Sequence, residues 1–448
     1  MFPYIPNSLK DEQKMLGRIG IEHVDELFRD IPSEVKLNRR LNLDAPKSEL
    51  EVTRLMGGLA AQNKNTDQLV CFLGAGAYDH YIPSIIDHLT SRQEFYTSYT
   101  PYQPEISQGT LRAIFEYQTM VSNLTGLEIA NASLYDQQTA VVEAALMAIS
   151  AVRKSDTILI SKGVHPESRQ VLKTYFKYRN LNVVEVDLYD GHTCPNNLRS
   201  KLAENVGGVI IQSPNFLGVI EDAKALETVT RESKAKFIMA VDPISLGTLR
   251  KPSEIGADIA VGEGQGLGNY MNFGGPYLGF ISAKEDLARK MPGRICGQSV
   301  DSEGKRAFVL TLQAREQHIR RFKATSNICS NQGLLAVRAT IYLSTMGKKG
   351  LKEVANQCLS KAHYLQERLL ATGKVQKPFN DPFFKEFVIT MDKPVAQVNH
   401  QLVEKGFLGG YDLSKEYPEL GNAMLIAVTE KRTREEMDAF VQALEVIL

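Results

Sequence analysis

The sequence is poor in the features of secreted and nucleic-acid-binding proteins. It has five cysteines in 448 residues, and none of them forms a CxxC pair. This favours a reduced, cytoplasmic protein over a disulfide-stabilised one. Its 52 basic and 52 acidic residues cancel, so no overall positive field would hold a polyanion. Nucleic acid is therefore not an expected partner.

Long apolar runs are also missing. The longest, Val141 to Val152, is interrupted by Glu143 and Ser150, and it is too short to cross a bilayer. The first residues contain no apolar core of signal-peptide length. We expect no membrane partner.

Several catalytic motifs are absent. The chain has no Walker A, GxGxxG, HExxH or GxSxG sequence, and its eight histidines do not cluster at metal-ligand spacing. A nucleotide site and metal catalysis are therefore not predicted, and no metal is expected.

What the sequence does contain is an alternation of short β-branched runs with helix-length segments. This alternation predicts an α/β fold with a mostly parallel sheet covered on both faces. Helices are predicted over residues 111–124 and 139–154. Strands are predicted at 158–160, 183–186, 209–211, 237–241, 259–261 and 278–281.

Three segments are predicted along the chain. Residues 1–60 read as a helical arm, 61–305 as a large α/β domain, and 306–448 as a small α+β domain. The small domain is predicted to begin with helix, because residues 304–343 are nearly free of helix breakers. It continues with a helix over 351–370, strands at 387–389 and 423–428, and a last helix that opens with the capping box Thr433-x-x-Glu436.

Asp242 is the first candidate for chemistry. It follows the apolar strand Met239-Ala-Val and precedes Pro243. An acid at the carboxyl end of a parallel strand points into the crevice where such sheets bind ligands, and it could hold a protonated cofactor ring nitrogen. The alternative is an N-cap for the next segment.

Two further segments could approach a ligand. Tyr135-Asp-Gln-Gln-Thr139 precedes an Ala-rich helix whose free N–H groups could hold a phosphate, or Asp136 or Thr139 could simply cap that helix. Residues 262–276 are dense in glycine. They allow close backbone approach to a ligand or another chain, or form a tight strand connection.

Two polar segments suit an interface. Residues 96–109 are dense in Tyr, Gln and Pro, and the prolines stiffen them into a pocket wall or an ordinary surface loop. Residues 315–323 carry a basic run that could bind an anion or form a solvated helix face.

Five longer motifs resemble one family, the glycine cleavage system P proteins, and within it the subunit 1 branch of the split bacterial form. The likeness runs from about residue 2 to the C-terminus. The motifs are Tyr99-Thr-Pro-Tyr-Gln-Pro-Glu-Ile-Ser-Gln-Gly109, Ala130-Asn-Ala-Ser-Leu-Tyr-Asp136, Val164-His-Pro-Glu-Ser168, Gln212-Ser-Pro-Asn-Phe216 and Thr325-Ser-Asn-Ile-Cys-Ser-Asn-Gln332.

The resemblance implies a fold, a reaction and partners. The fold is the pyridoxal-phosphate-dependent transferase fold type I, similar to aspartate aminotransferase. The partner is a homologous subunit 2, in a heterotetramer with two of each. Such a complex is an oxidoreductase that decarboxylates glycine with pyridoxal phosphate and passes the aminomethyl group to the lipoyl group of the H protein. The T and L proteins complete the system.

The resemblance also points to a missing lysine. Catalytic relatives carry a His-Lys pair upstream of a Gly-Gly-Pro, and counting back from Gly274 places that pair at Gly264-Gln265, or at Gln265-Gly266 with a one-residue gap. No lysine lies between Lys251 and Lys284. Because neither glutamine nor glycine can form a Schiff base, no catalytic residue and no covalent cofactor are expected on this chain. Pyridoxal phosphate would be held covalently by subunit 2.

The resemblance assigns the remaining site residues. In two places the chain departs from the family: Gln137-Gln138 stand where a glycine is common, which weakens phosphate binding, and Phe322 stands where an acid is usual. A vestigial or shared pocket is assigned to Asp242, His165, Asp136, Thr139 and Gln265. An interface or substrate channel is assigned to Tyr99, Tyr102, Gln103, Glu105, Gln108, Arg315, Arg320, Lys323, Thr325 and Asn327.

Two other functions stay open at this point. The chain could be a self-sufficient pyridoxal-phosphate enzyme with a displaced lysine, for which Lys162, Lys251 and Lys284 are the nearest candidates. It could also be a non-catalytic scaffold with no share in any active site.

Overall fold

Successive residues of the predicted strands face opposite sides of one sheet in the computed structural model of this chain. In β8 (Lys236–Val241), Phe237 and Met239 belong to one hydrophobic core, while Ile238 and Ala240 belong to the core on the other side. Burial of each large apolar side chain stabilises the fold by about 1.5–3 kcal/mol. Both faces of the sheet are therefore covered, as the runs of apolar residues predicted.

The central sheet has the strand order β2-β10-β9-β8-β7-β3-β4 within the described residues. Strands β4, β3, β7, β8 and β9 run parallel, and β10 is antiparallel to β9. The mostly parallel sheet is confirmed. The strands are β2 (Ile129–Ala130), β3 (Thr157–Ser161), β4 (Asn182–Val186), β7 (Val206–Gln212), β9 (Ile259–Glu263) and β10 (Gly279–Ala283).

The chain divides into two units, Met1–Lys64 and Asn65–Leu448. The structure describes every residue except 1–3, 5 and 273. Those residues of the predicted arm, and Phe273 of the glycine-rich segment, lie outside the described residues. The predicted boundary between residues 305 and 306 falls inside the second unit and stays a prediction.

Helix α6 (Gln137–Ala151) is buried against the sheet along most of its length. Its apolar residues form one hydrophobic core with β3, β7, β8 and β9. Among them lies a carboxylate, Glu143, which is only 4% exposed. Burial raises the pKa of Glu143 to about 7.

Replacing Glu143 with glutamine is expected to change the pH dependence of stability. The folded pKa lies above the ordinary value of 4.5, so the contribution of Glu143 is fully present below pH 4.5 and is lost as pH rises through 7. From pH 5 to pH 8 the wild type should therefore lose about 2.5 kcal/mol relative to Glu143→Gln. Denaturant unfolding at both pH values measures this. Glu128 is exposed, so the stability of Glu128→Gln should change with pH as that of the wild type does. If the stability of Glu143→Gln also changed with pH as the wild type does, the expectation would be contradicted.

A second, smaller sheet lies in the C-terminal part of the chain. Strand β16 (Ala423–Ala427) pairs antiparallel with β13 (Glu386–Thr390) and with β15 (Tyr411–Asp412). Its core includes Phe72 and Phe440, whose ring centroids are 4.2 Å apart. The last helix, α14 (Arg434–Ile447), opens with the predicted capping box of Thr433 and Glu436.

The expectation of helix directly after residue 304 was wrong. Strands β11 (Ile295–Val300) and β12 (Arg306–Thr311) form an antiparallel hairpin. Phe308 and Leu310 of β12 pack in one core with Leu111 and Ile114 of α5 (Gln108–Thr125), a period-two pattern that favours a strand. At Leu312 the backbone is left-handed, with φ 53°, which ends the strand.

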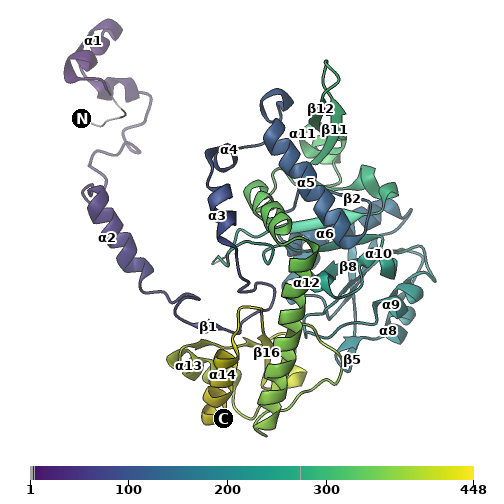
Figure 1. Ribbon diagram of the computed structural model, residues 1–448. Coiled ribbons are helices and arrows are strands. Elements are labelled where there is room, and N and C mark those ends of the chain that lie inside the picture. The colour runs from purple at the N-terminus through teal and green to yellow at the C-terminus, as the bar shows by residue number, and fades with distance from the viewer. Residues whose placement is uncertain (1–3, 5, 273) are drawn as a thin grey trace. The chain divides into compact units, whose positions relative to one another are not determined.

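The long helix α12 (Gly333–Ala371) joins the two sheets. It contacts α5 near its start and α14 of the C-terminal part (Figure 1). Its backbone departs from helical angles at Gly347, where φ is 59°, so the predicted helix over 351–370 is the second half of a kinked element.

The first unit has two capped helices, α1 (Leu9–Ile19) and α2 (Glu49–Ala60), and neither contains a buried residue. Many of its large apolar side chains are exposed, among them Leu9, Ile19, Leu27, Phe28, Leu41, Leu43, Leu55 and Leu59. Such a concentration of exposed apolar side chains is typical of a surface that contacts a partner.

Within the described part of the chain, no helix combines the length and apolar character of a membrane span. The remaining helices are α3 (Ser84–Thr90), α4 (Gln93–Tyr96), α7 (Pro166–Lys177), α8 (Pro195–Lys201), α9 (Ala223–Thr230), α10 (Pro252–Ile255), α11 (Gln317–Arg320) and α13 (Val395–Glu404). The remaining strands are β1 (Val70–Cys71), β5 (Leu188–Tyr189), β6 (His192–Thr193) and β14 (Phe407–Leu408).

Candidate functional site

Asp242 lies at the carboxyl end of β8, where the sequence places it, but its partner is a lysine. The Nζ atom of Lys385 is 2.8 Å from Asp242 Oδ2. Lys385 directly precedes β13 of the smaller sheet, and its side chain is 2% exposed. Asp242 also accepts a hydrogen bond from the backbone N–H of Ile244 (3.0 Å). Asp242 therefore caps a turn and forms a buried ion pair at the same time.

The Lys385 ammonium has two further partners. It lies 3.4 Å from the centroid of the Tyr78 ring, a cation–π contact, and 3.1 Å from Nε2 of His80. Because an ammonium only donates, Nε2 of His80 accepts and its Nδ1 carries the proton. That proton is donated to Glu430 Oε2 at 2.7 Å. A chain of buried polar groups thus runs from Asp242 to Glu430.

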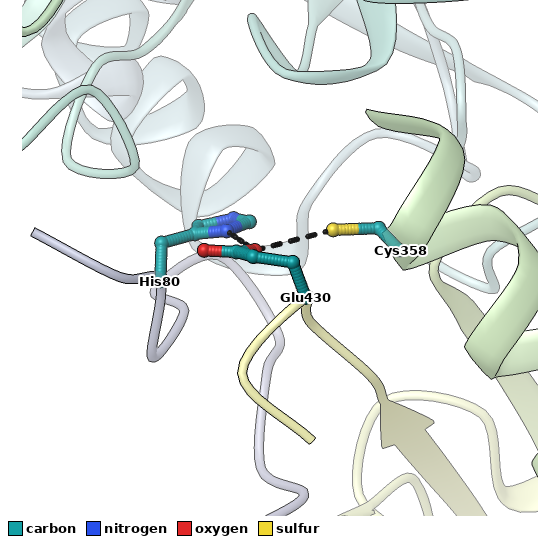
Figure 2. Close-up of side chains that lie close together, drawn as sticks. All are labelled: His80, Cys358 and Glu430. Atoms are coloured by element: carbon teal, nitrogen blue, oxygen red, sulfur yellow. Dashed lines mark hydrogen bonds and ion pairs between the residues drawn. The ribbon is translucent and has the colours of Figure 1, made fainter. Parts of the chain in front are cut away.

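Cys358 is the last group in this series of buried polar side chains. Figure 2 shows His80, Cys358 and Glu430 converging from three segments, with the thiol 3.4 Å from Glu430 Oε2. Their ligand atoms lie within 4.8 Å of one another, a combination that can hold a transition metal. In this structure the three groups satisfy one another, and the Lys385 ammonium beside His80 opposes a second cation. The expectation of no metal stays a prediction.

Glu386, the first residue of β13, is also held by hydrogen bonds. Its carboxylate accepts hydrogen bonds from the Tyr78 hydroxyl and the backbone N–H of Ala75, both at 2.8 Å. Burial raises the pKa of Glu386. Lys385 and Glu386 therefore anchor β13 to the segment that contains residues 75–80.

A second carboxylate, Glu263, lies at the N-terminus of α6. Three backbone N–H groups donate to it: Gln137, the first residue of α6 (3.2 Å), Gln265 (3.0 Å) and Leu278 (2.8 Å). Burial nevertheless raises the pKa of Glu263 to about 7, since no cation lies among these partners. The cradle predicted for a phosphate holds a side chain of the protein itself.

Gln265, at or next to the expected Schiff-base position, is 1% exposed. Its Oε1 accepts from the N–H of Tyr78 (2.8 Å), and its Nε2 donates to the carbonyls of Tyr78 (3.0 Å) and Asn269 (2.9 Å). The amide therefore ties the glycine-rich loop to residue 78. It offers no nucleophile to a ligand.

His165 lies at the pocket wall but is held by backbone groups. Its Nε2 donates to the carbonyl of Ala75 (2.9 Å), and its Nδ1 accepts from the N–H of Glu167 (3.2 Å). Burial lowers the pKa of His165, which agrees with this neutral tautomer. The ring packs edge-on against Phe216 at 4.7 Å.

Asp136 and Thr139 cap α6. Asp136 Oδ1 accepts from the backbone N–H of Thr139 (2.8 Å) and from its hydroxyl (2.9 Å). Neither residue lines the central cavity, which Asp242, His165 and Gln137 do line. A cofactor-binding role for Asp136, Thr139 and Gln265 stays a prediction.

The central cavity has a volume of about 30 Å³. It is lined by Tyr78, Asp242, Glu263 and Lys385 among others. A cavity of about 130 Å³ adjoins it and shares Gln137, His165 and Glu263. Both are smaller than pockets for cofactor-sized ligands, which measure about 300–1,000 Å³. Pyridoxal phosphate, which the fold implies, therefore does not fit the residues present: Gln265 offers no amine, the Lys385 amine is paired with Asp242, and the N–H groups at the start of α6 already donate to Glu263.

The predicted interface residues gather elsewhere. The Tyr102 hydroxyl accepts a hydrogen bond from Arg294 Nη2 (2.9 Å), and the Tyr102 ring meets that of His318 edge-on at 5.9 Å. A second cavity of about 210 Å³ is lined by Tyr99 of the first predicted segment and by Ser330, which lies beyond the second. It shares no lining residue with the central cavity.

Most of this predicted set is accessible at the surface. Gln108 instead holds the hairpin, since its amide exchanges two hydrogen bonds of 2.8 Å with the backbone of Phe308. Arg315 donates to the carbonyl of Met291, and both it and Gln108 are half-buried. The exposed members are Tyr99, Tyr102, Gln103, Glu105, Arg320, Lys323, Thr325 and Asn327.

None of the three lysines considered as a displaced Schiff-base residue lines the central cavity. Lys162 pairs with Asp187 (2.7 Å), Lys284 pairs with Asp258 (2.8 Å), and Lys251 donates to the carbonyl of Asn123 (2.8 Å). The lysine that does line the cavity, Lys385, was missed. So were Glu263 and Glu386, although a charged pair directly before the apolar run 387–389 is a signal that could have flagged Lys385 and Glu386.

The comparisons with known proteins agree with this geometry. The family model of the glycine cleavage system P-protein matches residues 3–444. The chain is 56% identical over 445 residues to the probable glycine dehydrogenase (decarboxylating) subunit 1 of Moorella thermoacetica, covering 99% of each chain.

Solved structures agree as well. A crystal structure of glycine decarboxylase (P-protein) of the glycine cleavage system, in inhibitor-bound form, superposes with a TM-score of 0.92 at 42% identity and covers 100% of both chains. A sphingosine-1-phosphate lyase of Burkholderia pseudomallei, at 14% identity and a TM-score of 0.66, covers 92% and 93% of the two chains and shares the fold alone. The fold is thus the predicted pyridoxal-phosphate-dependent fold type I, and the chain belongs to the glycine cleavage system P-protein family.

Proposed function

We propose that this chain is the subunit of a glycine dehydrogenase (decarboxylating) that lacks its own catalytic lysine. It completes the enzyme together with a homologous subunit 2, which holds pyridoxal phosphate covalently. The complex, with two copies of each subunit, decarboxylates glycine and transfers the aminomethyl group to the lipoylated H protein. The T and L proteins process that group and the lipoyl arm, and the system works in the reducing cytoplasm.

The observation that carries this proposal is the state of Gln265. In a chain of this family, the side chain at or next to the Schiff-base position is an amide with three hydrogen bonds to backbone. An amide nitrogen is not nucleophilic. The two adjoining cavities of about 30 and 130 Å³ are also smaller than pockets for cofactor-sized ligands. Decarboxylation therefore needs a second chain.

Two exposed surfaces support a partner subunit. The unit Met1–Lys64 exposes apolar side chains such as Leu27 and Phe28, which are half exposed to solvent at 50% and 48%. Tyr99 is 85% exposed beside the 210 Å³ cavity. Tyrosine is frequent in protein interfaces because it combines apolar area with a polar tip. The relatives' name, subunit 1, agrees with a second subunit.

Reconstitution tests the proposal. The purified chain should show no glycine–bicarbonate exchange, and neither absorbance of bound pyridoxal phosphate nor borohydride trapping should reveal a covalent cofactor. Adding subunit 2 and lipoylated H protein should restore exchange. Subunit 2 alone should be inactive, because the proposal makes this chain part of the working enzyme.

Two results would decide against it. Exchange by the chain alone would favour a self-sufficient enzyme. Full activity of subunit 2 without this chain would leave a scaffold role. As a finer control, Tyr99→Ser should weaken association with subunit 2, while Tyr189→Ser in β5, where the tyrosine is 75% exposed, should not. Analytical ultracentrifugation of the mixed subunits measures this difference.

A further inference from the structure

We infer that this chain has filled the cofactor pocket of its fold with its own side chains: Glu263 occupies the anion site at the start of α6, and Lys385 takes the place of a protonated ring nitrogen opposite Asp242. The inference rests on the proposed function for the identity of the missing group. It adds that the native chain binds neither pyridoxal phosphate nor free phosphate at this site.

The anion site is built by backbone groups from three segments. The N–H of Gln137 belongs to the first turn of a 15-residue helix, and those of Gln265 and Leu278 converge on the same carboxylate. Free N–H groups at a helix N-terminus, joined by N–H groups of a neighbouring loop, are the donors that hold phosphates. In this chain all three donate to Glu263, so an incoming phosphate would find them occupied.

The position of the cofactor's ring nitrogen is filled by a cation, the Lys385 ammonium. An acid beneath a protonated ring nitrogen needs a cationic N–H donor above it. The Lys385 ammonium is such a donor, 2.8 Å from Asp242, and it rests on the face of Tyr78. An ammonium that donates to Asp242 stands where the ring nitrogen would be. It therefore displaces the cofactor ring and does not serve as its covalent anchor.

The filled pocket also joins the two sheets. Asp242 follows one strand of the large sheet and Glu263 ends another, whereas Lys385 precedes and Glu386 begins a strand of the small sheet. Glu386 adds hydrogen bonds to Ala75 and Tyr78. Where a cofactor enzyme has a pocket between these elements, this chain has a fixed polar junction with a cavity of about 30 Å³.

Phosphate titration of Glu263 variants tests the anion site. Isothermal titration of the full chain with inorganic phosphate, at constant ionic strength, should detect binding to Glu263→Ala that is at least about tenfold tighter than any binding to wild type. Glu263→Gln is the matched control, because it fills the same space and its amide oxygen still accepts from the N–H groups of Gln265 and Leu278. Equal affinities of the three proteins, whether all bind or none does, would overturn the inference.

A measurement on the wild type keeps the test independent of any variant. The amides of residues 137, 265 and 278 should be protected from hydrogen exchange without added anion, and neither phosphate nor pyridoxal phosphate should change that protection. Fast exchange, or extra protection on adding either compound, contradicts a filled site.

The lysine variant tests the pocket as a whole. Gln265→Lys restores an amine, yet borohydride reduction in pyridoxal phosphate should trap no pyridoxyl group at position 265, because the pocket is still filled. Stoichiometric labelling of that position would overturn the inference. Glycine–bicarbonate exchange after reconstitution with subunit 2 distinguishes failure of this inference from failure of the proposed function. If exchange is restored but the wild-type chain binds phosphate at the amides of residues 137, 265 and 278, the filled pocket is refuted and the proposed function stands.

Discussion

Replacement of Lys385 by methionine is expected to lower the free energy of unfolding by about 3–5 kcal/mol. The side chain is 2% exposed, and its ammonium contacts Asp242, His80 and the Tyr78 ring at 2.8, 3.1 and 3.4 Å. Methionine has similar length but no charge, so Asp242 would keep a mostly buried carboxylate without its cation. Denaturant unfolding of the full chain measures the loss.

Two controls separate the charge pair from packing. The double variant Asp242→Asn with Lys385→Met removes both charges and should recover more than half of the loss, since no unpaired carboxylate remains. Lys251→Met removes a lysine that donates to the carbonyl of Asn123 and should cost about 1 kcal/mol or less. If Lys385→Met were no worse than Lys251→Met, the ion pair would not hold the junction.

Gly218→Ala is expected to be destabilising by about 2–5 kcal/mol. Gly218 has φ +86°, a conformation that costs an L-residue about 1–2 kcal/mol. An added Cβ would also overlap the carbonyl oxygen of Glu386 and lie 2.6 Å from its carbonyl carbon. That carbonyl belongs to the backbone of β13, which cannot move without disturbing the contacts of Lys385 and Glu386.

Gly406→Ala is the matched control for strain alone. Gly406 has φ +88°, nearly the same as Gly218, but a Cβ added there would have no heavy atom within 4 Å apart from its own chain neighbours. It should therefore cost only the conformational term of about 1–2 kcal/mol. Thermal or denaturant unfolding of both variants gives the difference, which reports the overlap with β13. Equal losses would show that this close approach is not important.

The two variants address the same structural question, which is how a strand of the small sheet is fixed against the large one. Lys385 provides the charge contact and Gly218 provides the space for the backbone to approach. Under the proposed function, in which the partner subunit holds the cofactor, a fixed junction has no conflict with substrate entry. A rigid chain would also present its partner-facing surfaces in one arrangement, which lowers the entropy lost on association.

The sequence alone determined the central sheet. Runs such as 237–241 and 259–261 are apolar at every position because both faces of a parallel sheet are covered, and that pattern depends only on near neighbours. The capping box of Thr433 and Glu436 is equally local. The glutamine at position 265 could be read directly against the family motif.

Local patterns failed where a strand depends on distant contacts. The hairpin of β11 and β12 is held by Gln108, which lies 200 residues before Phe308, its hydrogen-bonding partner. Residues 306–311 contain no helix breaker, so the absence of breakers wrongly favoured helix. The alternation that buries Phe308 and Leu310 is too short to identify a strand by itself. The packing of these two residues on α5 shows which face of the strand is buried.

Only the tertiary structure decided what fills the pocket. Glu263 and Gln265 are neighbours in sequence, but the helix N–H that completes the cradle comes from a residue 126 positions away. Lys385 meets His80 across 305 positions. Buried charges are paired because an isolated one is too costly to desolvate, yet which residues become partners depends on how the two sheets pack, and no local pattern in the chain records that.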